Sequence, residues 1–222
     1  MATRIADCRG LYEHRFDDHA RREKDAVWSV VVKSYLQRWI DPDDCVLDVG
    51  CGFGEFLNHV RCRRRIGVDV DPQAEQALLP GIEFHRTGAT DLSMIADGTV
   101  NLVFTSNVME HLPAKSDVEE MVEQVRRVLV PGGSFVALGP NIRIVPGAYW
   151  DFWDHLVPIS DRSLAELLET RGFRVVRCYP RFLPYTTRSA LPKARWLVQL
   201  YLRMPFVWRF FGAQFLMRAR KQ

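Results

Sequence analysis

One short stretch of the chain, residues 45–57, places three glycines directly after a run of apolar residues. Residues 46–49 have the apolar character of a strand that is buried on both faces. Glycines then occupy alternate positions from 50 to 54, and residues 55–60 have a helical spacing of apolar side chains. Glycine permits positive φ and lets a ligand approach the backbone. A strand, a glycine turn and a helix start therefore predict the first half of a nucleotide-binding βαβ unit.

The next predicted strand carries an acid where such folds hold ribose hydroxyls. This strand spans residues 66–70, and Asp69 lies about twenty residues beyond the turn. A dinucleotide fingerprint would need glycine or alanine at position 55, where Glu55 stands. The observed pattern is instead D-x-G-x-G-x-G, from Asp48 to Gly54. This pattern, followed by Gly67-Val68-Asp69, resembles the S-adenosylmethionine (SAM) site of class I methyltransferases.

A second element, R-x-L-x-P-G-G at residues 127–133, also resembles this family, and the resemblance covers roughly residues 40–180. Residues 149–155 and 181–185 are similar to a type 11/23-like branch associated with polysaccharide or glycoconjugate biosynthesis. The alternation of strands and helices predicts an α/β fold with a doubly wound parallel sheet. The resemblance adds a Rossmann-like, seven-stranded sheet of order 3-2-1-4-5-7-6, with strand 7 antiparallel. A capping box is expected to start a helix at Ser116.

The resemblance implies SAM as cofactor and S-adenosylhomocysteine as its product, with Asp69 on the ribose diol. Two acids usual in the family are replaced, by Gly88 in the adenine loop and by Asn101 in the fourth strand. Asp91 either substitutes for the adenine acid or only caps a helix. The residues expected at the cofactor are Asp48, Gly50, Cys51, Gly52, Gly54, Asp69, Val70, Ala89, Thr90, Asp91, Ser106 and Asn107.

Two histidines are candidates for a general base, because each follows a strand at the edge where the site belongs. His155 follows the fifth strand beside Asp154, which would orient its ring. His111 follows the fourth strand. Each also has a purely structural interpretation, as a loop anchor or a helix cap. No metal is expected, because no set of His, Asp and Glu shows ligand spacing on one helix.

The segment at about 188–211 is basic and aromatic, and it contains no acid. Two prolines, Pro192 and Pro205, predict two short helices in place of one. These helices either pack as core or a homodimer interface, or contact anionic lipid as a peripheral membrane element and lid. We expect an N-terminal helical cap over residues 1–40 and a methyltransferase domain over 41–222 that carries this segment as an insertion. Tyr12, His14, Arg15 and Phe16 either fold over the cofactor or belong to that cap.

Composition places the chain among globular proteins, with 222 residues and a formal net charge of +3. No secretory signal and no apolar run long enough to span a membrane is visible, so the expected location is cytoplasmic. The basic-aromatic segment adds the expectation of contact at the membrane periphery. The expected activity is methylation of a hydroxyl or amine on a small-molecule or carbohydrate-like acceptor. The alternatives are a non-catalytic SAM-binding scaffold and an RNA or protein methyltransferase. Nucleic acid is not expected as a partner, because the N-P-P-Y-type tetrapeptide is absent after the fourth strand.

Overall fold

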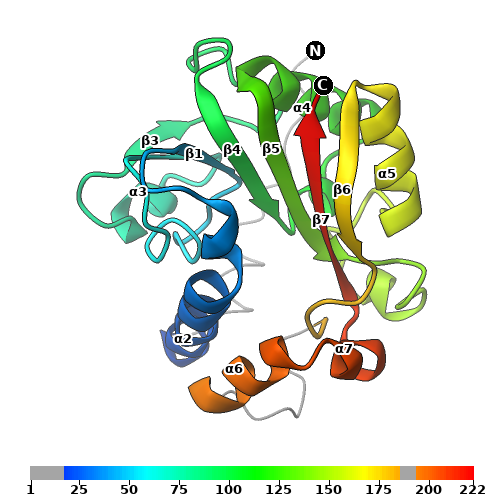
Figure 1. The fold of residues 1–222 in the computed structure, drawn as a ribbon. Helices are drawn as coiled ribbons and strands as arrows, with labels where there is room; N and C mark the ends of the chain where they lie inside the picture. Colours follow the sequence, from blue (N-terminus) through cyan, green and yellow to red (C-terminus); the bar gives the residue numbers. More distant parts are fainter. Residues whose placement is uncertain (1–17, 186–193) are drawn as a thin grey trace.

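The computed structural model describes residues 18–185 and 194–222, which form one seven-stranded sheet flanked by helices (Figure 1). The sheet order is β3-β2-β1-β4-β5-β7-β6, and β7 runs antiparallel to both of its neighbours. The predicted Rossmann-like topology is therefore confirmed. The strands are β1 (Cys45–Val49), β2 (Arg64–Asp69), β3 (Glu83–Arg86), β4 (Val100–Ser106), β5 (Leu129–Pro140), β6 (Phe173–Tyr179) and β7 (Gln214–Lys221).

The described helices cover both faces of this sheet, and three of them, α2, α6 and α7, gather at one of its ends (Figure 1). In Figure 1, α2, α6 and α7 lie at the lower end of the view, and α5 lies beside β6. The α-helices are α2 (Asp18–Ser34), α3 (Gln73–Ala77), α4 (Lys115–Val128), α5 (Asp161–Thr170), α6 (Arg195–Arg203) and α7 (Pro205–Phe211). Short 3₁₀ helices are η1 (Leu36–Trp39), η2 (Met109–His111) and η3 (Ala148–Asp151). Tyr12, His14, Arg15 and Phe16 lie outside the described residues.

Alternation along the strands divides the core between the two faces of the sheet. On one face, Leu47 of β1 belongs to a cluster with the apolar stripe of α4 and with Leu164 and Leu168 of α5. On the other face, Phe104 of β4 belongs to a second cluster with α2, α6 and α7. Successive strand residues point to opposite faces, so a central strand buries both sets of side chains.

Two local predictions are wrong. Residues 55–60 do not form an α-helix but a series of turns, with Asn58 N donating to Gly54 O at 2.8 Å. Only residues 55–63 remain between the glycine turn and β2, which leaves little room for a helix in a parallel crossover. The helix expected from Ser116 begins at Lys115, and its N-cap, Ala114, offers no side-chain hydrogen bond. The proposed capping box is absent because Ser116 lies inside the first turn.

The basic-aromatic segment contains two helices that meet at Pro205, as the sequence predicts for its described part. Helix α6 packs on α2. Leu202 of α6 and Trp208 of α7 are buried in the same apolar cluster as residues of α2. Tyr201 ties α6 to the segment after β6 by donating its hydroxyl to the Phe182 carbonyl at 2.6 Å. Among the described residues, no helix is long and apolar enough to cross a bilayer.

Candidate functional site

The glycine turn after β1 has a backbone shape that glycine favours. Gly50, Gly52 and Gly54 have φ angles of 75°, 49° and 78°. A Cβ on Gly50 would lie 2.2 Å from the Val108 Cγ2 atom, so the loop after β4 presses directly on the turn. A Cβ on Gly52 would meet nothing closer than the Glu55 Oε2 atom at 3.6 Å. The main chain at Gly52 is therefore open to a ligand, whereas Gly50 is tightly enclosed.

Asp69, at the end of β2, holds the turn from the other side. Its Oδ2 atom accepts the Gly52 N–H at 2.8 Å, and its Oδ1 atom accepts the Asp71 N–H at 2.9 Å. Burial raises the pKa of the Asp69 carboxyl, and these two main-chain donors oppose the shift. Each carboxylate oxygen can accept a further hydrogen bond, so Asp69 retains capacity for a ligand diol.

The other predicted residues of the turn are buried beneath it. Asp48 and Cys51 are 3 % and 4 % exposed. Burial raises the pKa of Asp48 well above its ordinary value, and the nearby carboxylates of Glu55 and Asp69 raise it further. Lys24 of α2 pairs with Glu55 at 2.7 Å, so α2 is tied to the same turn.

The loop after β3 lies next to Asp69, as expected for the adenine side of a nucleoside site. Thr87 N donates to the Asp69 carbonyl at 3.1 Å. A Cβ on Gly88 would be 4.0 Å from the exposed Val70 side chain, and Ala89 and Thr90 are half-buried. Asp91 closes a local turn by accepting the Ser93 N–H at 3.0 Å, and does not cap a helix.

Asn101 has a structural role at the opposite end of β4. Its Oδ1 atom accepts the Cys45 N–H at 2.9 Å and joins β4 to the first residue of β1. An amide provides the same acceptor as the carboxylate that the family usually has there. The change from Asp to Asn therefore preserves this contact and does not touch the glycine turn.

The loop after β4 continues from the glycine turn toward the two predicted histidines. Asn107 has a φ of 54°, the one positive value among described residues other than glycine. Its amide donates to the Ser106 hydroxyl at 2.9 Å, and its N–H donates to the Leu138 carbonyl at 3.0 Å. Left-handed backbone in a non-glycine residue costs free energy and often marks a functional site.

His111 and His155 come together from the loops after β4 and β5. Their ring centroids are 4.9 Å apart, with the rings nearly perpendicular. Asp154 pairs with His111: its carbonyl is 2.9 Å and its Oδ2 atom 3.3 Å from the His111 Nδ1 atom. From the sequence we predict a pairing of Asp154 with His155, but neither the contact of Asp154 with His111 nor the meeting of the two rings.

Glu110 is the member of this cluster that sequence reasoning missed. The residue is 2 % exposed, and one ligand atom from each of Glu110, His111 and His155 lies within 4.8 Å of the other two. Burial raises the pKa of the Glu110 carboxyl, and His111 opposes the shift. The adjacent pairs Glu110-His111 and Asp154-His155, each after a strand of the same edge, were the available signal.

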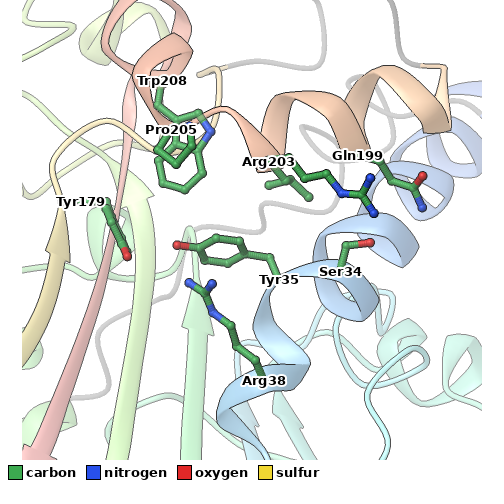
Figure 2. A pocket seen from close by; sticks show the side chains of 9 residues that line it. Ser34, Tyr35, Arg38, Tyr179, Gln199, Arg203, Pro205 and Trp208 are labelled. Carbon is green, nitrogen blue, oxygen red and sulfur yellow. The ribbon is translucent and has the colours of Figure 1, made fainter.

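A separate cavity of about 460 Å³ lies between α2, β6 and the two C-terminal helices (Figure 2). Its lining includes two arginines and no acid, and the Arg38 guanidinium stacks 3.7 Å from the centre of the Tyr35 ring. None of the cofactor or histidine residues discussed above line it. The lining residues are Ser34, Tyr35, Arg38, Tyr179, Gln199, Leu202, Arg203, Pro205 and Trp208.

Comparisons with known proteins agree on one family. Residues 47–137 match the model of a methyltransferase domain. A probable SAM-dependent methyltransferase of Mycolicibacterium smegmatis is 34 % identical over 59 % of this chain and 52 % of its own length. An uncharacterised methyltransferase of Synechocystis is 28 % identical over 62 % of this chain and 70 % of its own length. The chain thus spans about half the length of the first of these relatives.

Among solved structures, a SAM-dependent methyltransferase from Archaeoglobus fulgidus superposes with a TM-score of 0.68. It is 20 % identical and covers 97 % of this chain and 100 % of its own. At that identity the likeness shows the fold alone. The residues of this chain fit SAM, because an open glycine main chain at Gly52 and a carboxylate at Asp69 with spare acceptor capacity suit an adenosine ribose.

Proposed function

We propose, from the premise that this chain carries a class I SAM-dependent methyltransferase domain with SAM as its cofactor, that it methylates a hydroxyl or amine on a small-molecule or carbohydrate-like acceptor. One observation carries the proposal. The loop after β4 presses Val108 onto Gly50 of the cofactor turn and, three residues later, presents His111 to the histidine cluster. A cofactor on the turn and an acceptor at the cluster would therefore be neighbours.

The chemistry needs few groups from the protein. SAM supplies a methyl group on a sulfonium and leaves as S-adenosylhomocysteine. A bond forms between the acceptor oxygen or nitrogen and the methyl carbon as the S–CH₃ bond breaks, its electron pair stays on sulfur, and one acceptor proton is released. Holding the two reactants in line contributes about 7–11 kcal/mol in ideal cases. Assistance to proton loss contributes about 10²–10⁴-fold.

We assign this assistance to His155, His111 and Asp154. His155 packs against the rings of Tyr149 and Phe152, whose centroids are 4.8 and 5.1 Å from its own. The residue is 8 % exposed, so this packing holds the imidazole in a largely enclosed position. Asp154 holds His111 through the contacts to the Nδ1 atom. His111 and His155 are thus held in place before an acceptor binds, as catalytic groups must be.

The proposal is tested by measuring release of S-adenosylhomocysteine with panels of glycosides, small phenols and alcohols, small amines, RNA and peptides. We expect turnover with a small or carbohydrate-like acceptor. His155→Ala should then lower kcat by about 10²-fold or more. Its affinity for SAM, measured by calorimetry, should stay close to that of the wild type, because His155 acts on the acceptor.

Three other results would contradict the proposal, each in a different way. Binding of SAM without turnover on any panel would favour a scaffold subunit. Turnover confined to RNA or peptides would identify the other class of acceptor. Tighter binding of a nicotinamide dinucleotide than of SAM would remove the premise as well. Full activity of His155→Ala would leave methyl transfer intact but withdraw the catalytic role of that residue.

We further propose a cytoplasmic protein that contacts anionic membrane surfaces through α6 and α7. The buried side chains of these helices pack on α2, but a second set faces outward with Arg195, Arg203 and Arg209. Aromatic side chains beside arginines suit the headgroup region of an anionic bilayer. The exposed apolar residues of the two helices are Trp196, Leu200, Phe206, Phe210 and Phe211.

A further inference from the structure

The cluster at Glu110, His111 and His155 has the composition of a metal site as well as that of a catalytic pair. It offers two imidazole nitrogens and one carboxylate oxygen, all within 4.8 Å of one another. Metal–ligand bonds of about 2.0–2.2 Å place the ligands of one ion about 3–3.5 Å apart. The Glu110 Oε1 and His111 Nε2 atoms are already 4.0 Å apart. Side-chain rotations that bring the ligand atoms closer by up to about 1.3–1.8 Å would complete the site.

The residues that contact the three proposed ligands also suit a metal site. The His111 Nδ1 atom faces the Asp154 carbonyl and carboxylate, so a proton on Nδ1 leaves the lone pair on Nε2, the atom that faces Glu110. A ligating histidine typically donates its other ring N–H to a carboxylate or carbonyl in this way. On the other side, Tyr149 and Phe152 surround His155 with apolar rings.

The alternative explanation, that these side chains only join two loops, leaves their convergence unexplained. The main chain already joins the loops, because the Glu110 carbonyl accepts the N–H groups of Leu156 at 2.7 Å and Val157 at 3.1 Å. A carboxylate that is 2 % exposed is costly unless a cation or hydrogen-bond donors balance it. The ion pair that Glu110 makes is with His111, at 4.0 Å.

We propose that Glu110, His111 and His155 bind one divalent first-row transition metal ion, with Zn²⁺ or a close neighbour of Zn²⁺ as the expected ion. Two imidazoles and one carboxylate favour such ions over Mg²⁺ and Ca²⁺, which prefer oxygen ligands. Three protein ligands leave a coordination position open for an acceptor oxygen. No metal is expected from the sequence because ligand spacing is sought on one helix, whereas these ligands come from the loops after β4 and β5.

The catalytic consequence rests on the proposed function. An acceptor hydroxyl on the open position would release its proton to solvent water more readily, because the positive ion stabilises the resulting oxyanion. The histidines would then act on the acceptor through the ion, and Asp154 would act as a positioning residue for His111. Metal binding itself requires neither SAM nor an acceptor, so it is tested separately.

The test is titration of the full chain, first treated with a chelator, with Zn²⁺ by calorimetry and with Co²⁺ by visible absorption. We expect one equivalent of tightly bound metal and a Co²⁺ spectrum with ligand-field bands. His111→Ala, His155→Ala and Glu110→Gln should each weaken binding at least tenfold. Asp154→Ala removes the carboxylate but leaves the main-chain carbonyl on His111 Nδ1, so it should weaken binding by no more than about tenfold.

The matched control is His85→Ala. His85 also pairs with a glutamate, Glu83, at 2.8 Å, but on β3 and away from the cluster. Its loss should leave metal affinity unchanged. Because Glu110 and His155 are buried, each variant is checked by circular dichroism and thermal unfolding. The half-exposed His111 provides the variant with the least effect on folding.

Absence of a stoichiometric metal in the wild type would overturn the inference. So would binding that survives loss of any two cluster residues in folded variants, because the metal would then lie elsewhere. Neither outcome affects the proposed methyl transfer, which is measured through SAM affinity and turnover. If the chain both binds the metal and transfers the methyl group, removal of the metal by a chelator should lower kcat while SAM affinity stays the same.

Discussion

At the scale of single residues, Asp69 joins the sheet to the glycine turn after β1. Its carboxylate accepts one main-chain hydrogen bond from Gly52 and one from Asp71. A carboxylate can accept about four hydrogen bonds, so two lone-pair directions remain, and we propose that they hold the ribose diol of SAM. Hydrogen bonds to a charged acceptor contribute about 1.5–3 kcal/mol each.

Asp69→Ala should therefore weaken SAM binding roughly tenfold or more, as measured by calorimetry. The matched control is Asp71→Ala, because the Asp71 side chain is two residues away but accepts the Gln73 N–H at the start of α3. That variant should bind SAM nearly as the wild type does. Equal losses in the two variants would indicate a general disturbance of the loop and would remove the ribose assignment.

At the scale of elements, α6 presents two leucines to different surroundings within one turn. Leu202 is 5 % exposed and packs in the cluster with α2, whereas Leu200 is 46 % exposed. If α6 were only a lid or a membrane contact, the two residues would contribute similarly to the free energy of unfolding. Burial of Leu202 indicates instead that this helix is part of the core on that face of the sheet.

Leu202→Ala should lower the free energy of unfolding by about 2–5 kcal/mol, through lost burial and a residual cavity. Leu200→Ala, on the same helix, should change it by no more than about 0.5 kcal/mol. Urea unfolding followed by tryptophan fluorescence and circular dichroism measures both. A small effect in both variants would mean that α6 detaches from α2 in solution.

At the scale of the whole molecule, the two C-terminal helices combine a buried side with an exposed side. The exposed side is aromatic and cationic, and α6 and α7 contain no acid. The sequence alternatives of core and membrane contact are therefore not exclusive: the same helices can pack on α2 and present aromatic groups outward.

Co-sedimentation with vesicles tests the outward face. The protein should sediment with vesicles rich in phosphatidylserine, less with neutral vesicles, and less again as salt screens the charges. Phe206→Ser with Phe210→Ser should reduce binding several-fold without changing thermal stability, since both side chains are exposed. Leu79→Ser is the control, because Leu79 is an exposed apolar residue that is far in sequence from α6 and α7. Protein that stays in the supernatant at low salt would contradict membrane contact.

Local sequence was sufficient for the frame of the molecule. The glycine pattern reflects the positive φ that the turn requires, and Asp69 reflects its place at the end of the next strand. Both features can be recognised from local sequence. Strand order followed from the family resemblance and from the general rules of βαβ connection. The break between α6 and α7 followed from Pro205, whose ring fixes its own backbone.

Only the tertiary structure decided where some helices begin and which side chains contact one another. The capping box expected at Ser116 is absent because the helix begins one residue earlier, and a shift of one residue is below what local patterns determine. The helix expected at Glu55 became turns because the crossover to β2 is short. Glu110, His111, Asp154 and His155 meet through the side-by-side placement of β4 and β5, which brings residues far apart in sequence to one edge. The sequence determined which groups were present, and packing determined which partners they met.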